Sequence, residues 1–145
     1  MLALLLFFVS AGADPFVGTW HLNPAKSKWA NGAPPKEQVI RMEETPAGIR
    51  YSSETTNPDG SKSTGWYTAK YDGKEVHIVG NVYWDPVALT SPKPGTVVAT
   101  FFKRGKPSAV ATRVVSKDGS TMTITTEASD KVGKKFTNVG VYERH

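Results

Sequence analysis

Apolar and polar residues alternate over short stretches of this chain. No window of eleven or more residues carries apolar side chains at helical spacing, whereas Thr, Val, Tyr, Phe and Ile recur in short alternating runs. The pattern predicts strands at residues 16–23, 37–44, 48–56, 62–71, 74–80, 83–90, 96–103, 107–117, 120–128 and 135–144. The strand at 83–90 is the weakest, because Pro86 removes a backbone donor from its middle.

Compact turn signals separate many of these strands. Each supplies a glycine where φ is expected to be positive: Asn57-Pro58-Asp59-Gly60, Asp72-Gly73, Arg104-Gly105 and Asp118-Gly119. Strands joined this closely lie beside their sequence neighbours, and a long meander removes its exposed edges by closing on itself. We therefore predict an all-β chain that folds as a single up-and-down antiparallel β-barrel of 8–10 strands.

Turn length decides which side chains enter the barrel. A three-residue loop after Asn57 pairs Asn57 with Ser61, and hence Tyr51 with Tyr67. A two-residue turn at Asp72-Gly73 places Val76 and Ile78 on the same inner face. A three-residue turn there would bring His77 in instead, but the interior of a small barrel must be mostly filled, which favours the first register.

The same reasoning at residues 116–120 pairs Val114 with Met122 and Thr112 with Ile124. Trp66 and Trp84 are expected on the outer face, where they would mark a carbohydrate-stacking, protein or dimer surface or lie beneath a loop. The expected inner residues are Trp20, Leu22, Ile40, Met42, Tyr51, Tyr67, Ile78, Val98, Phe102, Val110, Val114, Met122, Ile124, Phe136 and Tyr142.

The N-terminal residues 1–13 differ from the rest of the chain. An apolar run from Leu2 to Val9 is followed by Ser10-Ala11-Gly12-Ala13, a small-residue ending of the type that a signal peptidase cleaves. The run is much shorter than the roughly 20 residues that span a bilayer. We expect a signal peptide at 1–13, a single barrel domain at 14–145, export to a periplasmic or extracellular location, and no stable membrane insertion.

Composition narrows the function classes. The 18 Lys and Arg residues against 13 Asp and Glu give a formal charge of +5, but the basic residues are scattered and form no stripe, so we expect no nucleic-acid partner. With no cysteine, stability must come from packing and the sheet. The composition does not indicate the oligomeric state.

The first predicted strand contains Gly18-Thr19-Trp20, which resembles the glycine-any-tryptophan opening of the lipocalins and their calycin relatives. The resemblance implies a lipocalin-like barrel with Trp20 at its closed end beneath a basic residue of a late strand. Arg144 occupies that place here, because the first and last strands meet when the barrel closes. The segments 18–28, 67–74 and 136–143 also resemble small secreted bacterial proteins, a resemblance that implies no particular activity.

Candidate chemistry is sparse. His21, His77 and His145 form no metal-ligand pattern, and neither a nucleophilic triad nor a phosphate-binding loop is present. The carboxylates Asp59, Asp72 and Asp118 belong to turns, and the glutamates fall on the outer face, apart from Glu44 at a strand end. We therefore expect no catalytic residue, no metal and no cofactor.

A few polar side chains remain among the apolar inner residues, as in many small-molecule pockets. The residues expected to bind a ligand are Trp29 of the Pro-rich loop 24–35, Met42, Tyr51, Tyr67, Phe102 and Asn138. The sequence favours a non-catalytic protein that binds a small apolar or amphiphilic molecule. A filled core, an isomerase or cyclase that uses Tyr51 or Tyr67 as an acid, and a secreted protein-interaction module remain alternatives.

Overall fold

The structure is a computed structural model and describes residues 14–80 and 83–145, so the predicted signal peptide at 1–13 lies outside the described residues. It contains one short 3₁₀ helix, η1 (Pro24–Lys26). The strands are β1 (Gly18–Leu22), β2 (Glu37–Thr45), β3 (Gly48–Thr56), β4 (Lys62–Ala69), β5 (Asp72–Val76), β6 (Val87–Lys93), β7 (Thr96–Lys103), β8 (Lys106–Val115), β9 (Thr121–Ser129) and β10 (Lys135–Arg144).

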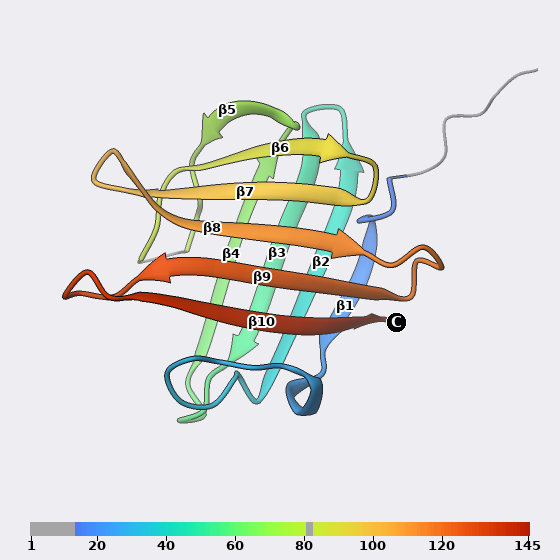
Figure 1. Cartoon of the computed structure of the whole chain (residues 1–145). Coiled ribbons are helices and arrows are strands. Elements are labelled where there is room, and N and C mark those ends of the chain that lie inside the picture. The colour runs from blue at the N-terminus through green and yellow to red at the C-terminus, as the bar shows by residue number, and fades with distance from the viewer. Residues whose placement is uncertain (1–13, 81–82) are drawn as a thin grey trace, which may run out of the picture.

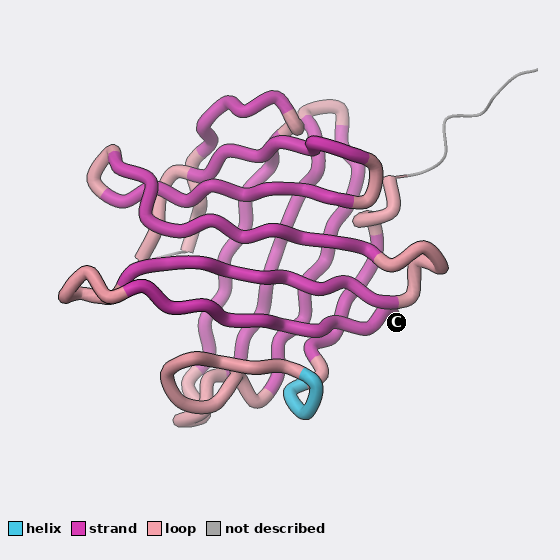
Figure 2. Tube along the Cα trace, viewed as in Figure 1, coloured by secondary structure: helices cyan, strands magenta, loops and turns pink. Residues whose placement is uncertain are grey.

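These strands form one ten-stranded antiparallel sheet in the order β4-β3-β2-β1-β10-β9-β8-β7-β6-β5. Each strand pairs with its sequence neighbour, except that β4 does not pair with β5, and β1 closes the sheet onto β10. The strands β6–β10 therefore lie across β1–β4 as two walls of one barrel (Figures 1 and 2). The predicted up-and-down barrel is confirmed, with ten strands.

The barrel is nearly closed, and its discontinuity lies between β4 and β5. The predicted hairpin at Asp72-Gly73 is wrong: Asp72 pairs with Thr90 of β6, and the register then shifts before Glu75. Asp72-Gly73 thus opens a bulge inside β5 instead of returning the chain along β4. An isolated bridge between Trp66 and Val79 spans the discontinuity.

The hairpin between β3 and β4 has the predicted register. The Asn57 amide donates to the Ser61 carbonyl at 2.8 Å, and Gly60 has a φ of +87°. Tyr51 therefore pairs with Tyr67, and both side chains face the interior.

The hairpin between β8 and β9 is one residue longer than predicted. Asp118 accepts hydrogen bonds from Ser116 Oγ and from the Ser120 amide, and the Ser116 amide donates to the Thr121 carbonyl, so the loop runs over 117–120. Val115, not Val114, pairs with Met122, and Arg113 pairs with Ile124.

This shift by one residue reverses the facing of β8, and with it that of β7. Four residues that were predicted inside lie on the outer face: Val98, Phe102, Val110 and Val114. The residues of β7 and β8 that face inward are Val97, Ala99, Phe101, Ala109, Ala111, Arg113 and Val115. Phe136 is only half-buried, at the far end of β10.

Arg144 lies over the ring of Trp20 at the closed end, with the guanidinium carbon 4.2 Å from the ring centroid. Trp20 is completely buried and donates from Nε1 to the Phe16 carbonyl at 3.0 Å. The guanidinium donates to the carbonyls of Val17 and Pro15, both at 2.6 Å. Gly18 has a φ of +141°, and a Cβ there would clash with Arg144, which explains the glycine of the Gly-Thr-Trp motif.

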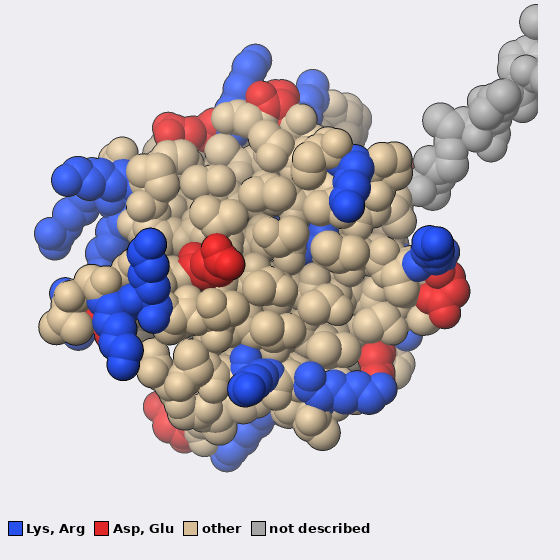
Figure 3. Space-filling model, in the orientation of Figure 1, with Lys and Arg blue, Asp and Glu red and all other residues tan. Residues whose placement is uncertain are grey.

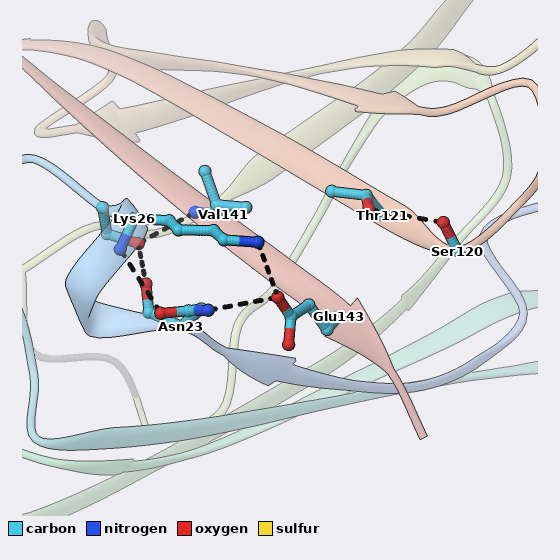
Figure 4. A network of polar contacts seen from close by, with 7 residues as sticks. Asn23, Lys26, Ser120, Thr121, Val141 and Glu143 are labelled. Atoms are coloured by element: carbon cyan, nitrogen blue, oxygen red, sulfur yellow. Dashed lines mark hydrogen bonds and ion pairs between the residues drawn. The ribbon is translucent and has the colours of Figure 1, made fainter.

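A polar network holds the start of the loop 24–35 against β10 (Figure 4). Glu143 accepts from Asn23 Nδ2 at 3.1 Å and from Lys26 Nζ at 3.4 Å. Ser27 Oγ accepts from the Val141 amide at 2.9 Å. These contacts join η1 to the last strand, and the loop then crosses one end of the barrel, the lower end in Figure 1.

Candidate functional site

A cavity of about 330 Å³ lies inside the barrel. Four residues expected to bind a ligand line it: Trp29, Tyr51, Tyr67 and Asn138. The remaining lining residues are Gln38, Ile40, Ser53, Thr55, Ser63, Thr64, Gly65, Ile78, Gly80, Tyr83, Trp84, Phe101, Ala111, Arg113, Ile124, Thr126, Gly140 and Tyr142.

Two residues predicted for the site do not line this cavity. Met42 faces inward but pairs with Gly18 at the closed end, where the buried Trp20 and Phe16 fill the barrel. Phe102 points outward, because a bulge follows Phe101 and the register of β7 leaves Phe101 as the inward residue.

The strand register arranges the lining in rows along the barrel. On one wall, Tyr51 pairs with Tyr67, the next inward row contains Ser53 and Gly65, and the row after it contains Thr55 and Ser63. On the other wall, the row of Arg113 and Ile124 is followed by Ala111, Thr126 and Asn138.

Side chains change in character from the deep end of the cavity to its mouth. The deep part holds a guanidinium and tyrosines, whereas the outer rows carry uncharged hydroxyls and amides. Tyr83, which is 70% exposed, also lines the cavity, so the cavity reaches the surface.

Arg113 is the principal polar group of the deep end. Arg113 is only 4% exposed, and its Nη2 donates to the Tyr67 hydroxyl at 2.8 Å. The guanidinium carbon lies 4.7 Å from the ring centroid of Tyr51, which stacks on Tyr67 with centroids 4.9 Å apart. The buried Arg113 Nε has no hydrogen-bond partner within the described residues.

The ionisation of this cluster follows from burial. Burial opposes the charge on Arg113, but the nearby oxygens of Tyr67 and Tyr51 outweigh it and raise the pKa of Arg113 above its already high ordinary value. Burial raises the pKa of Tyr51 to about 12, and it raises the pKa of Tyr142 as well. At neutral pH the cluster therefore consists of one cation and neutral phenols, which can donate hydrogen bonds to a ligand.

At the mouth, the loop carrying Trp29 is hydrogen-bonded to β10. Lys28 and Val139 exchange two backbone hydrogen bonds of 2.8 Å, and the Ala30 amide donates to Asn138 Oδ1 at 2.9 Å. Trp29 is thus held at the entrance. Asn138, which also lines the cavity, uses its oxygen to position the loop.

The side of the cavity near β5 and β6 contains a second tryptophan. Trp84 was predicted on the outer face, but it lines the cavity and packs against Phe101 with ring centroids 5.4 Å apart. The strand predicted at 83–90 begins only at Val87, so alternation along an assumed strand gave Trp84 the wrong facing. Trp66 does lie outside, 40% exposed, with Arg50 over its ring at 4.4 Å.

The described residues offer little other chemistry. They contain no cluster of three histidines, cysteines or acids that could hold a metal ion, and none of the described cavity-lining residues is acidic. Within the described ranges, no helix combines the length and apolar character needed to cross a bilayer. Lys and Arg side chains gather toward hairpin ends and are sparse over the middle of the visible face (Figure 3).

Arg113 is the site residue that sequence reasoning missed. The predicted three-residue loop at 116–120 paired Val114 with Met122 and Thr112 with Ile124, and so placed Val110, Thr112 and Val114 inside and Arg113 outside. The one available signal was the Ser116-Lys117-Asp118-Gly119-Ser120 turn, which suits a loop of either length. Small residues beside Arg113 make room for the cavity.

A scan against protein-family models and a search of curated proteins both find no match to this chain. Among solved structures, the fold is similar to that of zebrafish ileal bile acid-binding protein complexed with cholic acid. The TM-score is 0.55 over 90% of this chain and 99% of the other, with 13% sequence identity. The chain therefore has an all-β, nearly closed antiparallel barrel of the calycin type.

Proposed function

We propose that this protein reversibly binds one small apolar or amphiphilic molecule inside the barrel and does not transform it chemically. The cavity carries the proposal: a space of about 330 Å³, at the lower end of the roughly 300–1,000 Å³ common for small-molecule sites, is open to the surface and mostly lined by apolar and aromatic groups. Zebrafish ileal bile acid-binding protein, which is similar in fold, was crystallised with cholic acid, a small amphiphile.

Ligand affinity would come from the apolar surface of Ile40, Ile78, Phe101 and Ile124, because burial of apolar area is the main favourable term in such sites. The hydroxyl and amide groups in the outer rows would orient the molecule. Trp29 and Trp84 line the cavity, so a ligand changes their surroundings and the tryptophan fluorescence.

An isomerase or cyclase using a tyrosine as general acid is not favoured. Efficient general acids have a pKa near the working pH, whereas that of Tyr51 is raised to about 12. The described cavity lining also lacks a carboxylate that could act with the phenol. A protein-interaction module is the weaker alternative, because it needs no open interior.

We also propose that the protein is exported, on the strength of the apolar run and small-residue ending of residues 1–13. The mass of the protein isolated from the outer compartment of its host tests this part. Loss of those residues supports export with cleavage after Ala13, and absence of the protein from that compartment contradicts export.

Binding is tested with a neutral fluorescent probe, N-phenyl-1-naphthylamine, by titration and thermal melting. We expect saturable fluorescence and a raised Tm, because a ligand that binds only the folded state stabilises it by mass action. Tyr51→Ala should weaken binding about tenfold or more, whereas Trp66→Ala, on the outer face, should leave it within about twofold.

Trp66→Ala is the matched control, since both variants remove an aromatic ring from neighbouring strands. Equal losses in the two variants, or a larger loss in Trp66→Ala, would place the binding surface outside the barrel. Absence of saturable binding to the unaltered protein would contradict the proposed function itself.

A further inference from the structure

The cavity holds a buried positive charge with no buried negative charge to balance it. Arg113 is the one charged residue among the described lining residues. In the ranges 14–80 and 83–145, none of the Asp and Glu residues is buried. The polar neighbours of Arg113 include the Tyr67 hydroxyl, which accepts from its Nη2, and the Tyr51 ring, and neither is a carboxylate that would neutralise the cation.

The hydrogen-bonding capacity of Arg113 is also incompletely used. A guanidinium carries five N–H donors in a fixed planar fork, and the Nε donor is buried without a partner in the described structure. Unpaired buried charges and donors are costly for stability, and buried charges in proteins are normally paired. An arginine in this state is suited to pairing with an ionised oxygen group supplied from outside.

From these observations we infer that the ligand is an amphiphilic acid whose ionised carboxylate binds Arg113 at the deep end of the cavity. The inference rests on the proposed function and names its ligand class. The guanidinium of Arg113 lines the cavity and its buried Nε has no partner in the described structure, so it can pair with a carboxylate, which accepts paired N–H bonds from arginine. Tyr67 accepts from Arg113, and its own proton remains available to donate to the same carboxylate.

The rest of the lining sets the ligand's orientation. Ile40, Ile78, Phe101 and Ile124 surround the space beside and outward of Arg113, and the outer rows are uncharged. An acid would therefore enter with its carboxylate leading, place its apolar body between the walls, and leave its far end near Trp29. A neutral molecule of the same shape could fill the space but would leave the charge unpaired.

The inference is tested with decanoic acid and decanol, which share a chain length and differ in the charge of the head group. Both are titrated at pH 8, below their critical aggregation concentrations, by displacement of the neutral probe. The unaltered protein should bind the acid at least tenfold more tightly than the alcohol. In Arg113→Met, which keeps an unbranched side chain but removes the charge, this preference should disappear while the alcohol still binds.

Arg50→Met is the matched control, because it removes the same charge from the outer face beside Trp66. It should leave the preference for the acid unchanged. Loss of preference in both variants would attribute the effect to net charge and overturn the inference. Tyr67→Phe should reduce the preference partially, because it removes the phenol that supports the guanidinium.

A spectroscopic measurement covers the case in which Arg113→Met does not fold. Decanoic acid labelled with ¹³C at the carboxyl should show, when bound to the unaltered protein, a carboxyl pKa below its value in water, since a nearby cation favours the ionised form. A raised or unchanged pKa overturns the inference. Equal binding of acid and alcohol also overturns it while leaving the proposed function intact, whereas failure of acid, alcohol and probe alike contradicts the proposed function.

Discussion

At the scale of single residues, the exposed Arg144 and the buried Arg113 have opposite hydrogen-bonding states. At the closed end, each nitrogen of the Arg144 guanidinium donates to a backbone carbonyl, of Gly119, Val17 or Pro15, and the guanidinium lies over the ring of Trp20. Arg113 is buried with an unused donor. The contacts of Arg144 stabilise the fold, whereas the unused donor of Arg113 can form a hydrogen bond with a ligand.

The closed end gives a stability prediction. Trp20→Ala should lower the free energy of unfolding by about 3–5 kcal/mol, as a large truncation in a packed core. Arg144→Met should also destabilise, because it leaves several carbonyls without their donor. Arg41→Met, which removes only an exposed ion pair with Glu54 at 3.6 Å, should change stability by about 0–1 kcal/mol.

Urea unfolding of the three variants measures these differences. If Arg144→Met were no more destabilising than Arg41→Met, the closed end would not depend on the cation over Trp20. A Trp20→Ala protein as stable as the unaltered chain would contradict the burial of this side chain.

At the scale of elements, hairpin loops decide which face of each strand enters the barrel. The loop after Asn57 has the expected length and brings Tyr51 opposite Tyr67. The loop at 117–120 is one residue longer than expected and brings Arg113 inside. A one-residue difference in a surface turn thus selects between Thr112 and Arg113 for the cavity.

The turn glycines give a second prediction. Gly60 and Gly119 have φ values of +87° and +75°, which β-branched residues tolerate poorly. Gly60→Val and Gly119→Val should each lower stability by about 1–2 kcal/mol or more through backbone strain, since a Cβ at either position has open space and meets no clash.

Lys62→Val is the control for these two variants, because Lys62 is exposed and lies within β4. Thermal melting compares the three proteins. Unchanged melting of both glycine variants would be incompatible with left-handed turns at these positions.

At the scale of the whole molecule, the ten strands form a barrel that is packed at one end and hollow at the other. Trp20, Met42, Met122 and their neighbours fill the closed end, while the rows beyond Arg113 leave a cavity. In the described part of the chain β4 does not pair with β5, and the isolated bridge joins Trp66 of β4 to Val79, which follows β5, so the wall is least continuous beside Ile78 and Gly80, which line that cavity.

The buried phenols predict how global stability depends on pH. Burial raises the pKa of Tyr51 from 10.0 to about 12, and burial also raises the pKa of Tyr71 and Tyr142. Above pH 10 the unfolded chain loses phenolic protons that the folded chain keeps, so unfolding is favoured as pH rises. The contribution of Tyr51 to the free energy of unfolding is fully present below pH 10. It is lost as pH approaches 12, which lowers the free energy of unfolding by about 2–3 kcal/mol for Tyr51 alone.

Urea titrations between pH 8 and pH 11.5 measure this dependence, and tyrosinate absorbance reports the ionisation. In Tyr51→Phe the free energy of unfolding should fall less steeply as pH rises. In Tyr83→Phe, at an exposed position, it should fall as steeply as in the unaltered protein. If the free energy of unfolding fell as steeply with pH in Tyr51→Phe as in the unaltered protein, the pKa of Tyr51 would not differ between the folded and unfolded states.

By itself, the sequence determined the all-β class, the single meander, the closure of β1 on β10 and the contact of Trp20 with Arg144. These features depend on local periodicity, on glycines in turns and on the order of strands, all of which are present within short segments. The facing of β3, β4 and β9 was also accessible, because Tyr51, Tyr67 and Ile124 belong to strands whose alternation was read correctly.

Only the tertiary structure decided the facing of β7 and β8, the path of β5 and the inward position of Trp84. It also decided that Arg113, the residue most informative about a ligand, lies inside. The physical reason is that facing has a period of two residues, so one extra loop residue or one bulge exchanges the two faces of a strand. Whether the loop at 117–120 or a shorter one forms depends on how well the resulting faces pack against all the other strands, and that comparison exists only in the closed barrel.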